Sequence, residues 1–145
     1  MVAMYVFSVL IALLAAAVIG RTVVRGKSVP LIAMAHNIPY VATASVSNLR
    51  DLERKVTYAM SIEGARYIHI FVPCPLGWGS APEDTIKVAR LAVETGLFPL
   101  FEAEYGEVTG RTKIRQRVPV DEYLKLQKRF AHLFGAKGHP EMLAA

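Results

Sequence analysis

The chain has 145 residues, of which 53% are hydrophobic and 20% are charged, and its formal net charge is +5. This length and composition predict one globular domain with a substantial core, and they exclude a disordered or low-complexity chain. The single cysteine, Cys74, excludes an intrachain disulfide and any metal site built entirely from this chain's own thiolates.

The first segment differs from the rest of the chain. Residues 2–19 carry no charge, and the cations Arg21, Arg25 and Lys27 follow them. As a helix the segment would extend about 27 Å, close to the roughly 30 Å of a bilayer core. By the positive-inside rule, an inserted helix would leave the remaining chain in the cytoplasm. Four interpretations stay open: a membrane-spanning helix, a signal peptide, a buried core helix, or a mis-assigned gene start covering residues 1–24.

The next stretch predicts a short helix, a strand and a longer helix. Ser28 and Pro30 favour a helix start, and His36 ends this first helix. Residues 39–44 form the predicted strand, and the second helix ends at Gly64. Helical spacing assigns its buried side to Leu49, Leu52, Val56, Ala59 and Met60, and its surface to Arg50, Asp51, Glu53, Arg54 and Lys55.

Residues 67–72 form a nearly continuous apolar run, which predicts a strand buried on both faces. Another helix opens at Pro82 and ends at Gly96. The resulting order of strand, helix, strand and helix predicts a parallel sheet with right-handed crossovers. Two parallel strands are too few to bury both faces. We therefore expect part of a larger doubly wound α/β domain, with further strands upstream or in a partner.

The last part of the domain predicts a hairpin or edge extension over residues 98–104 and 107–118, followed by a helix over residues 119–134 and a tail over residues 135–145. Glu102 and Glu104 are interpreted as solvated charges of an edge strand. Alternating cations over residues 111–117 predict one basic strand face. No aromatic stacking pattern accompanies these cations, so we expect no nucleic-acid partner.

Two residues near the second strand invite a chemical role. Cys74 lies in a loop after that strand, at the sheet edge where α/β proteins place their chemistry. It is either a ligand or reactive group, or a small packed thiol. His69, within the strand, is interpreted as a packed histidine and not as a catalytic base.

Three blocks of sequence resemble the beta subunit of the 2-oxoacid:ferredoxin oxidoreductases, a family that includes pyruvate synthase. They are Ala-His-Asn-Ile-Pro-Tyr-Val-Ala-Thr-Ala-Ser at 35–45, Phe-Val-Pro-Cys-Pro-Leu-Gly-Trp-Gly at 71–79, and Ala-Arg-Leu-Ala-Val-Glu-Thr-Gly-Leu-Phe-Pro-Leu-Phe-Glu at 89–102. The residues at 119–130 resemble the last helix of that subunit. The resemblance covers about residues 26–133 and corresponds to the C-terminal half of such a subunit.

The resemblance implies a domain, residues 26–134, that is the C-terminal half of a thiamine-diphosphate-binding fold. The implied enzyme is cytoplasmic and decarboxylates a 2-oxoacid, with pyruvate the expected substrate. Thiamine diphosphate with Mg²⁺ supplies the chemistry, electrons pass through 4Fe-4S clusters to ferredoxin, and the acyl group passes to coenzyme A. The implied partners are the other subunits of the complex. The resemblance assigns Cys74 as one thiolate ligand of a 4Fe-4S cluster.

The chain also departs from the family pattern. The family's three other cluster cysteines and its Gly-Asp-Gly…Asn diphosphate motif lie upstream of the resembling region and have no counterpart here. We therefore assign no thiamine ligand to this chain and expect it to be inactive alone. Residues 1–24 then reflect a truncated or frame-shifted gene. The open alternatives are a membrane-anchored α/β domain without redox activity and a non-functional fragment.

Overall fold

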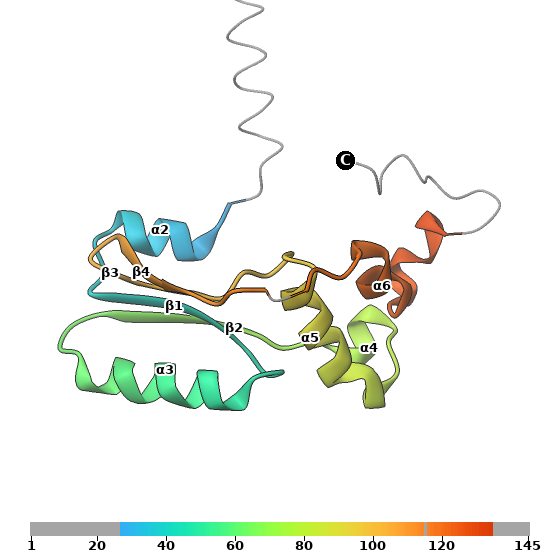
Figure 1. Ribbon diagram of the computed structural model, residues 1–145, viewed down its shortest axis with the longest axis horizontal. Helices are drawn as coiled ribbons and strands as arrows, with labels where there is room; N and C mark the ends of the chain where they lie inside the picture. Colours follow the sequence, from blue (N-terminus) through green and yellow to red (C-terminus); the bar gives the residue numbers. More distant parts are fainter. Residues whose placement is uncertain (1–26, 115, 135–145) are drawn as a thin grey trace, which may run out of the picture.

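A computed structural model describes residues 27–114 and 116–134, and Figure 1 shows their arrangement. The apolar segment 2–19, the tail 135–145 and Arg115 lie outside the described residues. The elements are α2 (Val29–Ala35), β1 (Tyr40–Ser45), α3 (Leu49–Ser61), β2 (Arg66–Phe71), α4 (Pro75–Trp78), η1 (Pro82–Asp84), α5 (Thr85–Glu94), β3 (Phe101–Glu104), β4 (Glu107–Arg111), α6 (Val120–Lys125) and η2 (Lys128–Leu133).

The four strands form one mixed sheet in the order β2-β1-β3-β4. β1 and β2 are parallel over six residue pairs, whereas β3 is antiparallel to β1 and to β4. The predicted parallel pair and the predicted hairpin are therefore confirmed. The sheet is not wholly parallel, because β3 of the hairpin pairs with β1 in the antiparallel direction.

Helices cover both faces of the sheet. Figure 1 shows α2 on one face and α3 on the other, with α4, α5 and α6 gathered beyond the carboxyl ends of β1 and β2. On the α2 face, Ala33 packs with Val41 and Ala103. On the α3 face, Ala59 packs with Tyr40 and Ala42. Among the described residues, no helix has the length and apolar character needed to cross a membrane.

The strand buried on both faces is β1 and not β2. Every residue of β1 is buried, because β2 and β3 flank it and helices cover both faces. β2 lies at the sheet edge, and its Ile70 is 40% exposed. The prediction that residues 67–72 are fully buried was therefore wrong for this chain.

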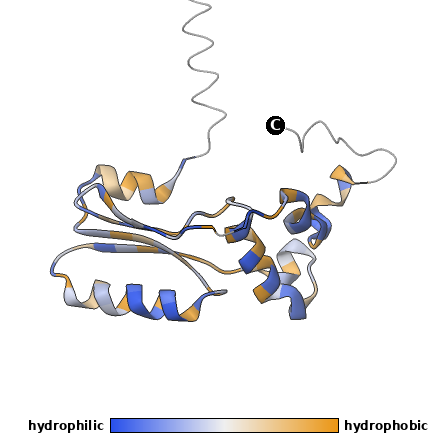
Figure 2. Ribbon diagram, in the orientation of Figure 1, coloured by the Kyte–Doolittle hydropathy of each residue, from blue (hydrophilic) through white to orange (hydrophobic). Residues whose placement is uncertain are grey.

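The predicted buried side of α3 was wrong in part, although Ala59 is buried as predicted. Leu49 and Met60 are 67% and 74% exposed, whereas Lys55 is only 1% exposed. The Lys55 ammonium donates to the Thr43 carbonyl of β1 at 2.9 Å and to the Asp51 carboxylate at 2.6 Å. These bonds satisfy the buried charge, so Lys55 lies beside Ala59 on the side of the helix that faces the sheet. Figure 2 accordingly shows hydrophilic turns along α3, whereas α2 is almost wholly apolar or neutral.

The carboxyl end of the domain has its own apolar cluster. Val88 and Ala92 of α5 pack with Tyr123 and Leu124 of α6 and with Leu133 of η2. The predicted helix over residues 119–134 is broken, because Gln127 has an extended backbone between α6 and η2. Its buried side chain donates to the Tyr123 carbonyl at 2.8 Å and accepts from Arg129.

The basic stretch is not a strand face. β4 ends at Arg111, so Lys113 and Arg117 lie beyond the strand. The hairpin is therefore shorter than the predicted 107–118 segment.

Replacing Lys55 tests the buried ion pair. We expect Lys55→Met to lower the free energy of unfolding by about 2–3 kcal/mol, because it leaves the Thr43 carbonyl without its donor while keeping the side-chain volume. Urea denaturation measures this change. Lys87→Met, on the exposed side of α5, is the matched control and should change stability by no more than about 0.5 kcal/mol. Equal effects of the two substitutions would contradict a structural role for Lys55.

Candidate functional site

The candidate site lies at the carboxyl ends of β1 and β2. Because these strands are parallel and in register, with Ser45 opposite Phe71, both chain exits meet at one edge of the sheet. This is the edge where open α/β sheets place ligands. The loop after β1 contains Ser47, and the loop after β2 contains Cys74.

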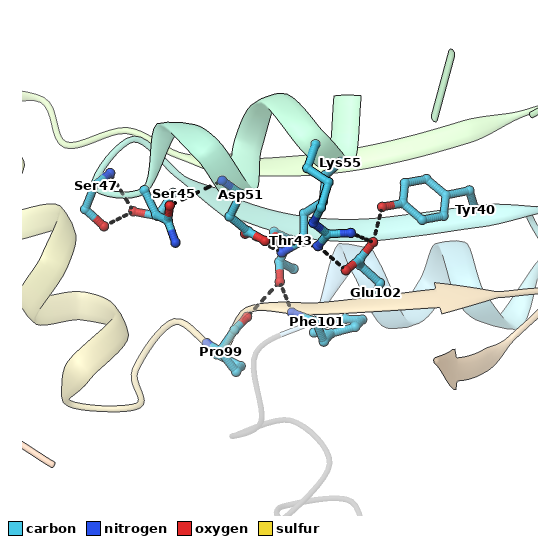
Figure 3. A network of polar contacts seen from close by, with 11 residues as sticks. Tyr40, Thr43, Ser45, Ser47, Asp51, Lys55, Pro99, Phe101 and Glu102 are labelled. Carbon is cyan, nitrogen blue, oxygen red and sulfur yellow. Dashed lines mark hydrogen bonds and ion pairs between the residues drawn. The ribbon is translucent and has the colours of Figure 1, made fainter. Parts of the chain in front are cut away.

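The loop after β1 is held by short polar contacts. The hydroxyl oxygens of Ser45 and Ser47 lie 2.9 Å apart, and the Ser47 N–H donates to the Ser45 hydroxyl at 3.2 Å, as part of Figure 3 shows. The Val46 N–H donates to the Phe71 carbonyl at 3.3 Å, which ties this loop to the end of β2. Asn48 then caps α3 by accepting from the Asp51 N–H.

Cys74 is the residue that precedes the one-turn helix α4. Its Sγ accepts the Gly77 N–H at 3.4 Å, and its carbonyl accepts the Trp78 N–H at 3.0 Å. The thiol side chain is nevertheless exposed. The interpretation of Cys74 as a packed thiol is therefore wrong.

Aromatic rings and one arginine pack against residues 74–79, which we call the Cys74 turn. Trp78 lies against Phe71 of β2, with ring centroids 5.8 Å apart. The Arg129 guanidinium lies 4.0 Å from the Trp78 ring centroid, within the range of a cation–π contact. Gly79 ends α4 with a left-handed backbone (φ +64°), and its carbonyl accepts from Lys128 N–H at 3.4 Å. α4 is thus fixed between β2 and η2, an arrangement that sequence periodicity did not reveal.

His69 is packed, as predicted. Its ring contacts Phe98 edge-on, with centroids 5.5 Å apart, and its Nδ1 is buried without a hydrogen-bond partner among the described residues. Within residues 27–114 and 116–134, no three His, Cys, Asp or Glu side chains gather as a metal site.

Glu102 is not the solvated edge residue that was predicted. β3 lies between β1 and β4, and the Glu102 side chain is only 16% exposed. It accepts from Tyr40 at 2.7 Å and from both terminal nitrogens of Arg54, which joins β1, β3 and α3 (Figure 3). Its neighbour Glu104 accepts from the Tyr58 hydroxyl at 2.9 Å.

This network shifts the titration of its members. Burial alone would raise the pKa of the Glu102 carboxyl, but hydrogen bonds from Arg54 and Tyr40 outweigh burial and hold that pKa below its ordinary value of 4.5. Burial and the neighbouring Glu102 raise the pKa of Tyr40 well above its ordinary range. The paired charges of Arg54 and Glu102 thus join α3 to β3.

Comparison with known proteins gives the class of the chain. Pyruvate synthase subunit PorB of Methanocaldococcus jannaschii is 54% identical over 107 residues, which are 74% of this chain and 36% of that subunit. Pyruvate synthase subunit PorB of Methanosarcina barkeri is 50% identical over 115 residues, which are 79% of this chain and 39% of that subunit. Ketoisovalerate oxidoreductase subunit VorB of Pyrococcus abyssi is 45% identical over 109 residues, 74% of this chain and 35% of that subunit. No protein-family model matches the chain.

These relatives are named as subunits of enzymes that act on 2-oxoacids, pyruvate synthase and ketoisovalerate oxidoreductase. More specifically, the matched part of this chain is homologous to part of the beta subunit of the 2-oxoacid:ferredoxin oxidoreductases, which confirms the predicted family. The chain spans little more than a third of the length of these relatives.

The residues present do not complete a cofactor site. A 4Fe-4S cluster is generally bound by four thiolates, and this chain has one cysteine. Cys74 fits a single ligand position because its sulfur is exposed and oriented. No step of a reaction is therefore assigned to this chain alone.

The left-handed backbone of Gly79 provides a test of the Cys74 turn. A Cβ at this position would lie 2.8 Å from the Lys128 Cβ. We expect Gly79→Ala to cost roughly 2 kcal/mol through backbone strain and displacement of η2, and to shift the fluorescence of Trp78, the sole tryptophan. Gly110→Ala, whose new Cβ would make only ordinary contacts, is the control. An unchanged Trp78 spectrum in Gly79→Ala would contradict the described contact with η2.

The lowered pKa of Glu102 predicts a specific pH dependence. A carboxyl with a depressed folded-state pKa stabilises the fold above its unfolded pKa, and this contribution is lost as the pH falls through the folded pKa. We expect Glu102→Gln to lose about 1–2 kcal/mol at pH 7 and to show a flatter decline in acid. Thermal unfolding between pH 7 and pH 3 measures both effects. Glu63→Gln, an exposed position, should leave the wild-type profile unchanged.

Proposed function

We propose that this chain provides part of the beta subunit of a pyruvate-oxidising 2-oxoacid:ferredoxin oxidoreductase. The observation that supports this most strongly is the 54% identity to a pyruvate synthase subunit over 107 residues. Pyruvate synthase subunits span 43–54% identity and ketoisovalerate oxidoreductase subunits 44–45%, so pyruvate as the substrate rests on the pyruvate synthase subunits at 50–54% identity. The cytoplasmic location expected from the resemblance stays a prediction.

The proposed assembly uses thiamine diphosphate with Mg²⁺ for decarboxylation and 4Fe-4S clusters to pass electrons to ferredoxin, with coenzyme A receiving the acyl group. The groups that hold thiamine and the other cluster thiolates belong to parts of the enzyme outside this chain. Other subunits of the complex are therefore the direct partners of this chain.

Within that assembly, we assign Cys74 as one thiolate ligand of a 4Fe-4S cluster. The Gly77 N–H at 3.4 Å orients the sulfur, and the rigid backing of Trp78 and Arg129 fixes the turn that presents it. Hydrogen bonds to cluster sulfurs and ligands are among the means by which proteins tune these centres. The turn thus contributes both a ligand and a nearby main-chain donor.

A reconstituted complex tests the function and the ligand together. The full chain is expressed anaerobically with the complementary part of its subunit and the other subunits. Pyruvate-dependent reduction of ferredoxin is then measured beside the iron content. We expect Cys74→Ser to lose the iron of one cluster and at least about tenfold in activity, the size of loss that even indirect changes around metal ligands produce.

Leu76→Ala is the matched control for this experiment. Leu76 follows Cys74 in the same turn and is 97% exposed, so its loss should leave iron and activity unchanged. Full iron content in Cys74→Ser would contradict the assignment of Cys74 as a cluster ligand. Absence of pyruvate-dependent reduction in an iron-loaded wild-type complex would contradict the proposed substrate.

A further inference from the structure

Arg129 is an exposed residue whose side chain is nevertheless held in one place. Its guanidinium carbon lies 4.0 Å from the centroid of the Trp78 ring and 4.6 Å from that of the Phe130 ring. Its Nε–H donates to the side-chain oxygen of Gln127 at 2.9 Å. Two aromatic rings and one hydrogen bond therefore restrict a side chain that would otherwise change rotamer freely.

Gln127 connects Arg129 to the apolar cluster at the carboxyl end of the domain. Only 1% of Gln127 is exposed, and its side-chain nitrogen donates to the Tyr123 carbonyl at 2.8 Å. Tyr123 is itself buried in that cluster. The break between α6 and η2 therefore places Gln127 inside the domain and Arg129, two residues further on, against the Cys74 turn.

Trp78 links this anchor to the Cys74 turn. The Trp78 N–H donates to the Cys74 carbonyl at 3.0 Å, and the Ser80 N–H donates to the Pro75 carbonyl at 3.1 Å. α4 has only four residues, which are too few to form a stable helix on their own. The turn therefore depends on contacts from other elements, and Arg129 supplies one of them to the Trp78 ring.

We propose that Arg129, anchored by Gln127, is a positioning residue for Cys74. Through Trp78 it holds the Cys74 turn in the conformation that presents the sulfur to a 4Fe-4S cluster. Preorganisation matters here because this chain has one cysteine, so the other thiolates come from outside it. The inference rests on the proposed function, in which Cys74 is a cluster ligand, and it adds the residues that hold that ligand in place.

Hydrogen exchange of the full chain, without any cofactor, tests the positioning role. In Arg129→Gln we expect the protection of the Trp78 and Ser80 amides to fall about fivefold, which is the size of effect expected from a cation–π contact. The amides of β1 should keep their protection, because β1 lies outside the Cys74 turn and is paired on both sides. A selective loss of this kind separates positioning from general destabilisation.

Lys128→Gln is the matched control for the lost charge. Lys128 is the adjacent exposed cation, and its aliphatic carbons lie beside Gly79. Glutamine removes the same positive charge but keeps the Cβ, Cγ and Cδ atoms. The protection of the Cys74 turn should therefore be unchanged in this variant.

A double-mutant cycle tests whether Arg129 acts through Trp78. Trp78→Leu removes the ring against which the guanidinium lies. On that background, Arg129→Gln should lower the protection of the Ser80 amide less than twofold, because the shared contact is already lost.

The reconstituted complex tests the consequence for the cluster. We expect iron release to a chelator to be at least about threefold faster with Arg129→Gln than with wild type or Lys128→Gln, because changes around the ligands of a metal weaken its binding. The measurement is a rate of metal loss and requires no turnover of pyruvate.

Four results would overturn the inference. They are unchanged protection in Arg129→Gln, an equal loss of protection in β1, a full fivefold effect of Arg129→Gln on the Trp78→Leu background, and unchanged iron release. The first three are measured without a cluster, so they are distinguishable from failure of the proposed function. Full iron content in Cys74→Ser marks that other failure, and it would overturn the ligand role and this inference with it.

Discussion

The structure depends on one buried ammonium group. Lys55 is held between the Thr43 carbonyl and the Asp51 carboxylate, and it determines which side of α3 lies against β1. A buried lysine without these partners would cost several kcal/mol, so the helix cannot rotate without losing them. Arg54, one residue on, extends the same constraint to Glu102 of β3. α3 is therefore positioned by charge pairing together with the packing of Ala59 on β1.

The same strand that receives Lys55 organises the site edge. Thr43 donates to the Pro99 carbonyl at 2.7 Å and accepts the Phe101 N–H at 2.9 Å, which fixes the entry of the chain into β3 (Figure 3). β1 is thus bonded to α3 and β3 at its centre and paired with β2 along its length. Because β1 cannot shift, the loops containing Ser47 and Cys74 emerge at fixed places.

Sequence reasoning succeeded where local signals decide the structure. The alternation of strands and helices predicted the parallel pair β1–β2, and Gly106 in the turn marked the hairpin. It failed where contacts between residues far apart in the sequence decide the structure. Ion pairs spaced like Asp51 and Lys55 are usual on exposed helix faces. Here the Lys55 ammonium is buried because it also donates to the Thr43 carbonyl of β1, a contact that the sequence of the helix does not reveal. The Cys74 loop could be located from sequence, but its support by Arg129 could not, because a break at Gln127 positions η2.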